Sequence, residues 1–300
     1  MRVVVALGGN ALLHRGEALS AANQQDNVKR AAAALAPLAR DHELIVTHGN
    51  GPQVGLLALQ GESFGPDTAQ PLDVLDAETE GMIGYLIERE LGNLLPGRKT
   101  AALLTQIEVD PRDPAFANPT KPIGPVYDQA QAEELARARG WTVRPDGERY
   151  RRVVPSPAPM AILEIGVIRL LVDQAVIVVC AGGGGIPVVR RADGGFAGVE
   201  AVIDKDAASA LLARDLDADA LLMLTDVDAV YEDWGTPNAR PIRQATPEQL
   251  AAKTFAPGSM APKVQAARDF ATATGGVAGI GRLEDAGAIL DGTAGTLVAR

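Results

Sequence analysis

Residues 3–10 read Val-Val-Val-Ala-Leu-Gly-Gly-Asn, an apolar run that stops abruptly at two glycines. An apolar run of this length, ended by a turn signal, predicts a buried strand that leads into a glycine loop. The pattern returns twice: residues 44–47 lead into His48-Gly49-Asn50-Gly51-Pro52, and residues 175–180 lead into the glycines of residues 182–185. We interpret the three loops as one continuous rim at the ends of neighbouring strands.

Segments with helical character separate these strands. We expect helices at residues 21–39, 73–95, 161–172, 205–214 and 259–272, and further short strands at residues 100–104, 221–224 and 296–298. Strands that alternate with helices predict an α/β fold, with parallel strands joined by crossover helices.

Residues 108–159 break this rhythm, because they hold many prolines and charged clusters and little helical periodicity outside residues 130–139. A structureless stretch of this length is unusual inside a compact domain. We therefore interpret it as an inserted subdomain and a candidate lid, with short β elements near residues 122–127 and 141–154.

Composition excludes several classes of protein. The 300 residues are 47% hydrophobic, which suits a large buried core rather than disorder. The formal charge of −10 argues against non-specific binding to nucleic acid, which needs clustered Lys and Arg. An anionic substrate would need a locally positive pocket in this acidic chain, so the position of each lysine is informative.

Cellular location is predicted from what the sequence lacks. The single cysteine, Cys180, cannot form an intramolecular disulfide and fits a small core residue. Neither a signal peptide nor an apolar run of about 18 residues is recognisable. We expect a cytoplasmic protein.

Glycine loops at strand ends are typical of phosphate-binding sites, because bare backbone N–H groups can approach an anion closely. The chain has no Walker A motif, so it is not a P-loop protein. Gly49-x-Gly51-x-x-x-Gly55 resembles a dinucleotide fingerprint, but its spacing is off by one and no acidic residue follows as that motif requires. A nicotinamide enzyme is therefore disfavoured.

Three lysines lie in contexts that suggest phosphoryl transfer, a reaction that mainly requires positive charge around a moving anionic group. Lys205 lies at the expected start of a helix, next to Asp206, which could orient it. Lys263 and Lys121 each adjoin a proline. The histidines, His14, His42 and His48, are scattered, and no His/Cys/Asp cluster has the spacing of metal ligands.

Several longer motifs closely resemble those of the carbamate kinases, a branch of the amino-acid kinase superfamily. They occur in order along the whole chain, at residues 6–11, 47–55, 119–125, 151–157, 182–188, 202–206 and 258–263. Pro-Thr-Lys-Pro-Ile-Gly-Pro (119–125) and Gly-Ser-Met-Ala-Pro-Lys (258–263) are the most specific of them. Thr79-Glu80, the stretch 278–281 and the short stretch 246–255 depart from the family pattern.

The resemblance implies a three-layer αβα sandwich around an open, mainly parallel sheet, as a single domain over residues 1–300 with residues 108–159 as the lid. Residues 1–175 would form the acceptor-binding half and residues 176–300 the nucleotide-binding half. The implied reaction is ATP + carbamate ⇌ ADP + carbamoyl phosphate, with Mg²⁺ held mainly by the nucleotide phosphates. A homodimer that works toward ATP synthesis in arginine catabolism is also implied.

The resemblance also implies roles for individual residues. Lys205, Lys263 and Lys121 would contact the phosphoryl groups, and Asp206 would organise the first two. Carbamate would be held by the rim residues Gly8, Gly9, Asn10, Gly49, Asn50 and Gly51. The nucleotide pocket would be lined by Thr225, Asp226, Tyr231 and Met260, with Lys263.

Two alternatives remain open at this stage. The same fold could phosphorylate a larger acyl acceptor such as acetylglutamate or aspartate, which would require an Arg clamp for the second carboxylate. Arg15 is the only nearby candidate for that clamp. A non-catalytic nucleotide or metabolite sensor could keep the glycine loops but would have little need of all three lysines.

Overall fold

The structure, a computed structural model, describes residues 1–13, 17–64, 70–256 and 258–300. His14 and Arg15 lie outside the described residues, as does the side chain of Asn10. In the part of the chain that is described, no helix is both long and apolar enough to cross a membrane.

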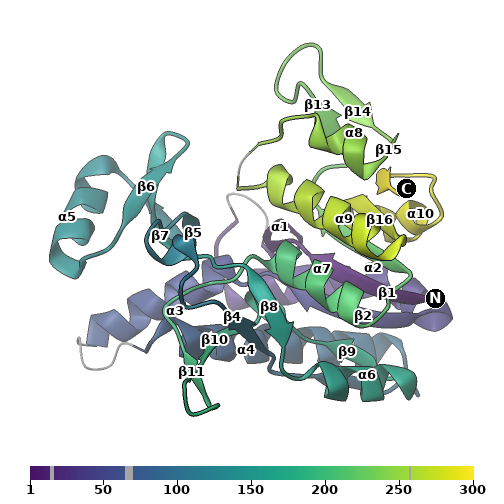
Figure 1. The fold of residues 1–300 in the computed structure, drawn as a ribbon, viewed down its shortest axis with the longest axis horizontal. Coiled ribbons are helices and arrows are strands. Elements are labelled where there is room, and N and C mark those ends of the chain that lie inside the picture. Colours follow the sequence, from purple (N-terminus) through teal and green to yellow (C-terminus); the bar gives the residue numbers. More distant parts are fainter. Residues whose placement is uncertain (14–16, 65–69, 257) are drawn as a thin grey trace.

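A sheet of eight strands forms the centre of the molecule (Figure 1), in the order β15-β17-β16-β12-β1-β2-β9-β3. All neighbouring strands run parallel except β16 and β17, which pair antiparallel. The predicted α/β class and mainly parallel sheet are confirmed. The strands are β1 (Arg2–Leu7), β2 (Glu43–His48), β3 (Thr100–Ala102), β9 (Ile177–Val179), β12 (Ala220–Thr225), β15 (Gln244–Ala245), β16 (Val277–Arg282) and β17 (Thr296–Val298).

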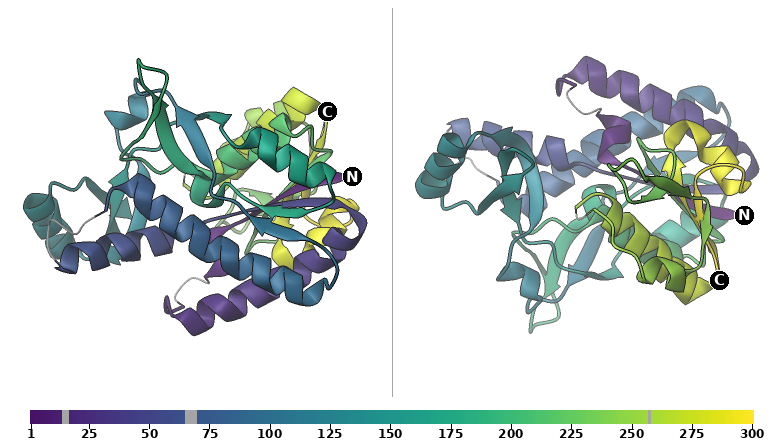
Figure 2. Two further views of the ribbon diagram at one scale, coloured as in Figure 1. Left: turned by 90° about the horizontal axis from the view of Figure 1, so that it is seen from below. Right: turned by 90° about the horizontal axis from the view of Figure 1, so that it is seen from above.

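Helices cover both faces of this sheet (Figure 2) and complete the three layers. Successive side chains of β1 point to opposite faces of the sheet, so the strand contributes to two separate hydrophobic clusters. Val3, Val5 and Leu7 belong to one cluster, and Val4 and Ala6 belong to the other. The first cluster is closed by α2 (Ala21–Asp41), α4 (Leu72–Leu94) and α10 (Ala286–Leu290). The second is closed by α6 (Ile165–Asp173), α7 (Lys205–Asp215), α8 (Pro247–Ala251) and α9 (Met260–Thr274).

A second sheet, of four strands, was missed by the sequence analysis. Its order is β11-β10-β4-β8, with bounds β11 (Phe196–Gly198), β10 (Ile186–Arg190), β4 (Gln106–Val109) and β8 (Pro159–Ile162). The predicted helix at residues 161–172 is therefore wrong at its start, because Ala161 and Ile162 pair with β4 and helix α6 begins only at Ile165. A short apolar run does not by itself distinguish a strand from a buried helical turn.

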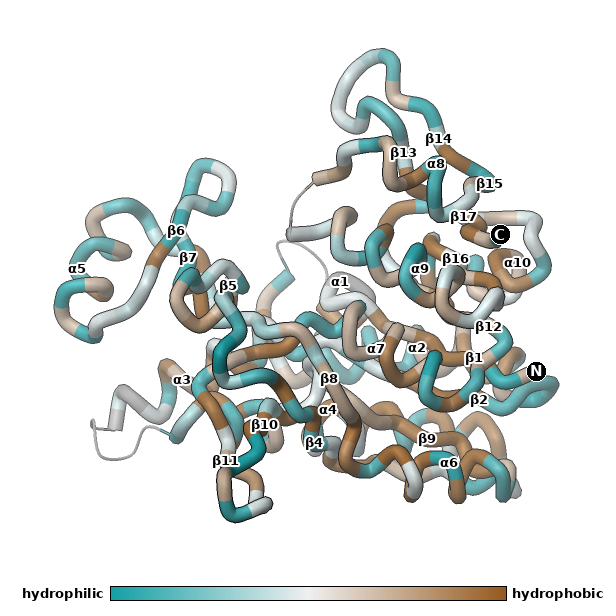
Figure 3. The backbone as a smooth tube through the Cα atoms, in the orientation of Figure 1, coloured by the Kyte–Doolittle hydropathy of each residue, from teal (hydrophilic) through white to brown (hydrophobic). Residues whose placement is uncertain are grey.

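A third sheet projects from the body of the protein (Figure 1). Its order is β5-β7-β6, and α5 flanks it; the bounds are β5 (Lys121–Tyr127), α5 (Gln129–Arg139), β6 (Val143–Asp146) and β7 (Arg149–Val154). Figure 3 shows hydrophilic residues predominating around α5 and β6, as expected for a solvated projection. We call these residues, 121–154, the projecting unit.

The remaining elements are short, apart from α3, or lie at the edge of the cleft described below. They are α1 (Gly9–Leu12), α3 (Gly51–Phe64), the 3₁₀ turns η2 (Pro114–Phe116), η3 (Gly182–Gly184) and η4 (Leu283–Asp285), and the hairpin of β13 (Val230–Glu232) and β14 (Arg240–Ile242).

The projecting unit rests on α3 through a contact between two glycines. A Cβ atom added to Gly55 would lie 1.9 Å from the Cα of Gly124, far inside any real carbon–carbon contact. Gly124 itself has a φ of +70°, in the left-handed region, and it lies in the irregular stretch of β5. Backbone therefore packs directly on backbone where the unit joins the body.

We expect Gly55→Ala to lower the free energy of unfolding by about 1–3 kcal/mol, the usual cost of overpacking a tight contact. Urea denaturation measures this loss. Gly287→Ala in α10 is the matched control, because a Cβ there has no neighbour within 4 Å. Its stability should equal or slightly exceed that of the wild type. A wild-type midpoint for Gly55→Ala would contradict the packing described here.

Candidate active site

The carboxyl ends of neighbouring strands bring the predicted loops together. Strand β1 lies between β2 and β12, so Gly8-Gly9 is adjacent both to Gly49–Gly51 and to Thr225-Asp226. A Cβ added to Gly49 would lie 3.2 Å from the backbone nitrogen of Gly9, so the first two glycine loops touch directly. Ligands bind at this edge of open α/β sheets.

The third glycine loop follows β9, the neighbour of β2 on its other side. Gly183, Gly184 and Gly185 have φ values of +71°, +105° and +81°, a run that only glycine adopts without strain. A Cβ on Gly184 would also lie 2.3 Å from the carbonyl oxygen of Ile203. The loop therefore packs directly against the chain that leads into α7.

A cleft of about 790 Å³ opens above these loops. The sequence-predicted residues that line it are Gly8, Gly9, Gly49, Asn50, Gly51, Lys121, Lys205, Asp206, Thr225, Asp226, Tyr231, Met260 and Lys263. The tertiary structure thus gathers residues from positions 8 to 263 into one cavity. It has the size of a small-molecule site.

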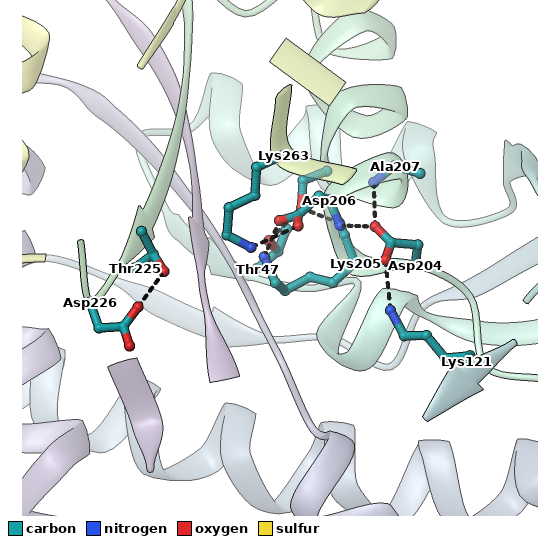
Figure 4. Close-up of polar contacts among 10 residues, drawn as sticks. Thr47, Lys121, Asp204, Lys205, Asp206, Ala207, Thr225, Asp226 and Lys263 are labelled. Carbon is teal, nitrogen blue, oxygen red and sulfur yellow. Dashed lines mark hydrogen bonds and ion pairs between the residues drawn. The ribbon is translucent and has the colours of Figure 1, made fainter. Parts of the chain in front are cut away.

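Asp206 lies between two lysines on the floor of the cleft (Figure 4). Lys205 Nζ donates to Asp206 Oδ1 at 2.5 Å, and Lys263 Nζ donates to Asp206 Oδ2 at 2.9 Å. Each carboxylate oxygen therefore accepts one ammonium group. The cluster is nearly closed to solvent, with Lys205 8% and Asp206 4% exposed.

The charges of this cluster depend on one another. Burial is the largest influence on Lys205 and lowers its pKa, while the Asp206 carboxylate opposes that effect. Burial alone would raise the pKa of Asp206, but the two ammonium groups outweigh it and hold that pKa well below its usual range. Asp206 is therefore ionised at neutral pH, and the cluster carries a net positive charge that faces the cleft.

Lys121 reaches the same region from the projecting unit. Its Nζ donates to Asp204 Oδ2 at 2.6 Å, as Figure 4 shows. The other oxygen of Asp204 caps α7 by accepting from the backbone nitrogens of Asp206 and Ala207. One carboxylate thus fixes the start of the lysine-bearing helix and ties the projecting unit to it. Sequence analysis placed Asp204 in the motif but assigned it no role.

The far side of the cleft is formed by the segment after β12. Thr225 donates its hydroxyl to Asp226 at 3.1 Å, and the Tyr231 hydroxyl donates to Asp228 at 2.8 Å. Trp234, which sequence analysis missed, stacks at a tilt on Tyr231 with ring centroids 5.1 Å apart and is 62% exposed. This wall offers flat apolar surface next to polar groups, which suits a base and its ribose.

Behind the glycine loops lies a buried polar layer that sequence analysis missed. Burial lowers the pKa of His48 to about 4, so its ring is neutral at physiological pH. Glu80 accepts from the backbone nitrogens of Gly182 and Thr105, at 2.8 and 3.1 Å, and burial raises its pKa to about 8. The only signal for this layer in the sequence was that Thr79-Glu80 departs from the family pattern.

Comparisons of the chain with a family model, with curated sequences and with solved structures agree with one another. Residues 1–278 match the model of the amino acid kinase family. The chain is 54% identical to a carbamate kinase of Haemophilus influenzae over 100% of this chain and 97% of that one, and 54% identical to one of Rhizobium meliloti over 99% and 93%. A solved carbamate kinase of Giardia lamblia bound to AMP-PNP superposes with a TM-score of 0.89 at 40% identity, over 99% of this chain and 98% of that one.

Asp206→Asn should lower the pKa of Lys205 further, because the favourable carboxylate is lost while burial and the neighbouring Lys263 charge remain. Titration of protein labelled with ¹³C at lysine Cε measures this pKa, and the spectrum of Lys205→Arg assigns the resonance. Asp26→Asn is the matched control, because Asp26 pairs with Lys29 on the surface of α2. An unchanged or raised Lys205 pKa in Asp206→Asn would contradict the coupling.

Proposed function

This chain belongs to the amino acid kinase family and is a carbamate kinase, and from that premise we propose how its cleft divides the work of the reaction. The enzyme transfers a phosphoryl group reversibly between ATP and carbamate, giving ADP and carbamoyl phosphate. The observation that carries our proposal is the convergence of Lys121, Lys205 and Lys263 on one cleft lined by glycine loops.

The glycine loops bind the acceptor in this proposal. Gly49 packs directly against the backbone of Gly8 and Gly9, and these residues line the cleft with Asn50 and Gly51. We assign Asn10, the next residue of the first loop, to the same acceptor site. Backbone N–H groups at the start of α1 and α3 favour an anion. Carbamate is small and singly charged, so a rim of backbone donors without a large side-chain pocket suits it.

The lysines stabilise the transferring group. A phosphoryl group in flight spreads negative charge over its oxygens, and the protein contributes mainly position and positive charge. Lys205 and Lys263 are held a fixed distance apart by Asp206 before any substrate arrives. Their charge is therefore organised in advance, and little reorganisation is needed at the moment of transfer.

Lys121 completes the charge from the opposite wall, and residues 108–159 act as the lid that carries it. The ion pair between Lys121 and Asp204 supports this, because it joins the projecting unit to the start of α7. In this proposal residues 1–175 form the acceptor half and residues 176–300 the nucleotide half.

ATP or ADP occupies the wall formed by Thr225, Asp226, Tyr231 and Met260, and Lys263 reaches its phosphates. The aromatic pair of Tyr231 and Trp234 supports a base at this wall. The Giardia relative whose structure holds AMP-PNP shares the fold closely, with a TM-score of 0.89.

Mg²⁺ accompanies the nucleotide and neutralises phosphate charge. Among the described residues no group of three or more His, Cys, Asp or Glu side chains gathers in a way that could hold a metal ion. Mg²⁺ in kinases is commonly held by substrate phosphates with one or two carboxylates. We therefore assign most of its ligands to the phosphates of the nucleotide.

We also propose that the enzyme works in the cytoplasm, toward ATP synthesis in arginine catabolism, as its sequence resemblance implies. Carbamoyl phosphate is a mixed anhydride of a carboxyl group and phosphate. Such compounds have a high phosphoryl-transfer potential, which favours transfer to ADP.

A homodimer is the assembly we propose. Six large apolar side chains are exposed on neighbouring elements: Met82 and Tyr85 on α4, Leu104 before β4, Met160 on β8, and Val167 and Leu170 on α6. Strands β4 and β8 pair directly, α6 follows β8 along the chain, and Leu104 lies close to Gly81 of α4. Figure 1 shows α4, β4, β8 and α6 together in the lower part of the molecule. An apolar surface of this kind is typical of an interface between subunits.

The function is tested by ATP formation from carbamoyl phosphate and ADP with the purified protein. We expect Lys205→Ala to lower kcat by about 10²–10³, the loss seen when one preorganised donor is removed. Lys29→Ala, an exposed lysine on α2, is the matched control and should keep wild-type turnover. Near-normal turnover in both Lys205→Ala and Lys263→Ala would refute the proposed roles, and no ATP from the wild type would refute the activity.

The assembly is tested by light scattering on a sizing column. The wild type should have twice the 31.2 kDa mass of one chain. Leu170→Glu, which puts a charge in the proposed interface, should shift the protein toward the mass of one chain. Val126→Glu on β5 changes another exposed apolar side chain that lies outside that surface, so it should leave the mass unchanged. A monomeric wild type would overturn the proposal.

A further inference from the structure

Helix α4 presents three buried polar side chains to the glycine loops without reaching the cleft itself. Asp76, Thr79 and Glu80 are spaced i, i+3 and i+4, so they share one face of the helix. Their exposed fractions are 0%, 0% and 2%. They do not line the cleft, whereas Asn50 and Gly183, which they approach, do.

Asn50 is held by both of its amide protons. Its Nδ2 donates to Asp76 Oδ1 at 2.9 Å and to Thr79 Oγ1 at 2.9 Å. The Thr79 hydroxyl donates its own proton to the backbone oxygen of Leu75 within α4, so towards Asn50 it can only accept. With its nitrogen towards α4 and Oδ1 away from it, the Asn50 amide gives both of its protons an acceptor.

The same amide fills the space next to the third glycine loop. A Cβ on Gly183 would lie 2.2 Å from Asn50 Nδ2, so no side chain fits between them. The backbone oxygen of Asn50 meanwhile accepts from Gln53 and Val54 and begins α3. Asn50 thus begins α3 through its backbone oxygen and sets the separation of two glycine loops through its side chain.

We propose that Asp76 is a positioning residue for the carbamate site, acting with Thr79 through Asn50 to hold Gly49–Gly51 in the conformation that presents its backbone N–H groups. The proposal rests on the acceptor role assigned to that loop above. Asp76 itself touches no substrate.

The buried surroundings of Asp76 agree with such a role. Burial is the main cause that raises its pKa well above its usual range, and the nearby charges of Glu80, Asp73 and Glu200 add to it. Its Oδ2 has no hydrogen-bond partner among the described residues. Asp76 accepts from Asn50 through Oδ1 alone, and the amide oxygen of an asparagine can reproduce that bond.

The test compares Asp76→Leu, Thr79→Val and Asp76→Asn in the ATP-forming assay, with each substrate varied in turn. Asp76→Leu and Thr79→Val each leave one buried Asn50 proton without an acceptor. We expect each to raise KM for carbamoyl phosphate about tenfold, the scale expected for a buried donor that loses its partner. KM for ADP should stay within about twofold, because the nucleotide wall is not touched by α4.

Asp76→Asn should restore most of the affinity for carbamoyl phosphate, since it keeps the acceptor and the shape. Glu78→Gln, an exposed carboxyl change on the same helix, is the matched control. Thermal unfolding and ADP binding confirm that each variant is folded, and Thr79→Val, which is isosteric, keeps the test decisive if Asp76→Leu does not fold.

Three outcomes overturn the inference: both KM values unchanged, both raised together, or Asp76→Asn as impaired as Asp76→Leu. Each of these leaves the activity of the wild type intact. Failure of the wild type to make ATP is a separate result, which refutes the proposed function rather than the role of Asp76.

Discussion

The site depends on one carboxylate held between two ammonium groups. Lys205 and Lys263 would repel each other if brought together in a buried pocket alone, and burial lowers the pKa of Lys205. Asp206 offsets both effects by giving each lysine one oxygen, at 2.5 and 2.9 Å. Because two lysines surround a single carboxylate, we propose that the triad attracts phosphate although the whole chain has a net charge of −10.

The architecture serves to hold that triad opposite the glycine loops. Lys205 is fixed by the capped start of α7, and Lys263 by the first turn of α9, which packs beside α7 in the same core cluster. The loops extend from β1, β2 and β9, which lie in consecutive order in the sheet. The sheet therefore sets the distance between the glycine loops and the lysine pair.

Buried polar side chains that do not line the cleft hold the glycine loops in their conformations. Glycine loops have few side chains of their own, so their conformations need support from neighbouring elements. Helix α4 supplies it, through Glu80 to the backbone of Gly182 and through Asp76 and Thr79 to Asn50. Such groups are costly to bury without partners, which makes each of these hydrogen bonds important to the loop it holds.

The sequence by itself determined the fold class, the glycine rim and the identities of the lysines, because these depend on local patterns. A strand that stops at Gly8-Gly9, or a lysine beside Asp206, is visible in a few consecutive residues. The same local character explains the misassigned start of the helix at residues 161–172, since only pairing with β4 shows that Ala161 and Ile162 are in a strand.

Only the tertiary structure decided which groups meet. The bond from Lys263 to Asp206 spans 57 positions, that from Lys121 to Asp204 spans 83, and that from Gly182 to Glu80 spans 102. No local pattern encodes such pairs, because they follow from the order of strands and the packing of helices on the sheet. The sequence also does not show which polar side chains are buried. Burial is the largest influence on the pKa values of Asp76, Glu80 and Lys205.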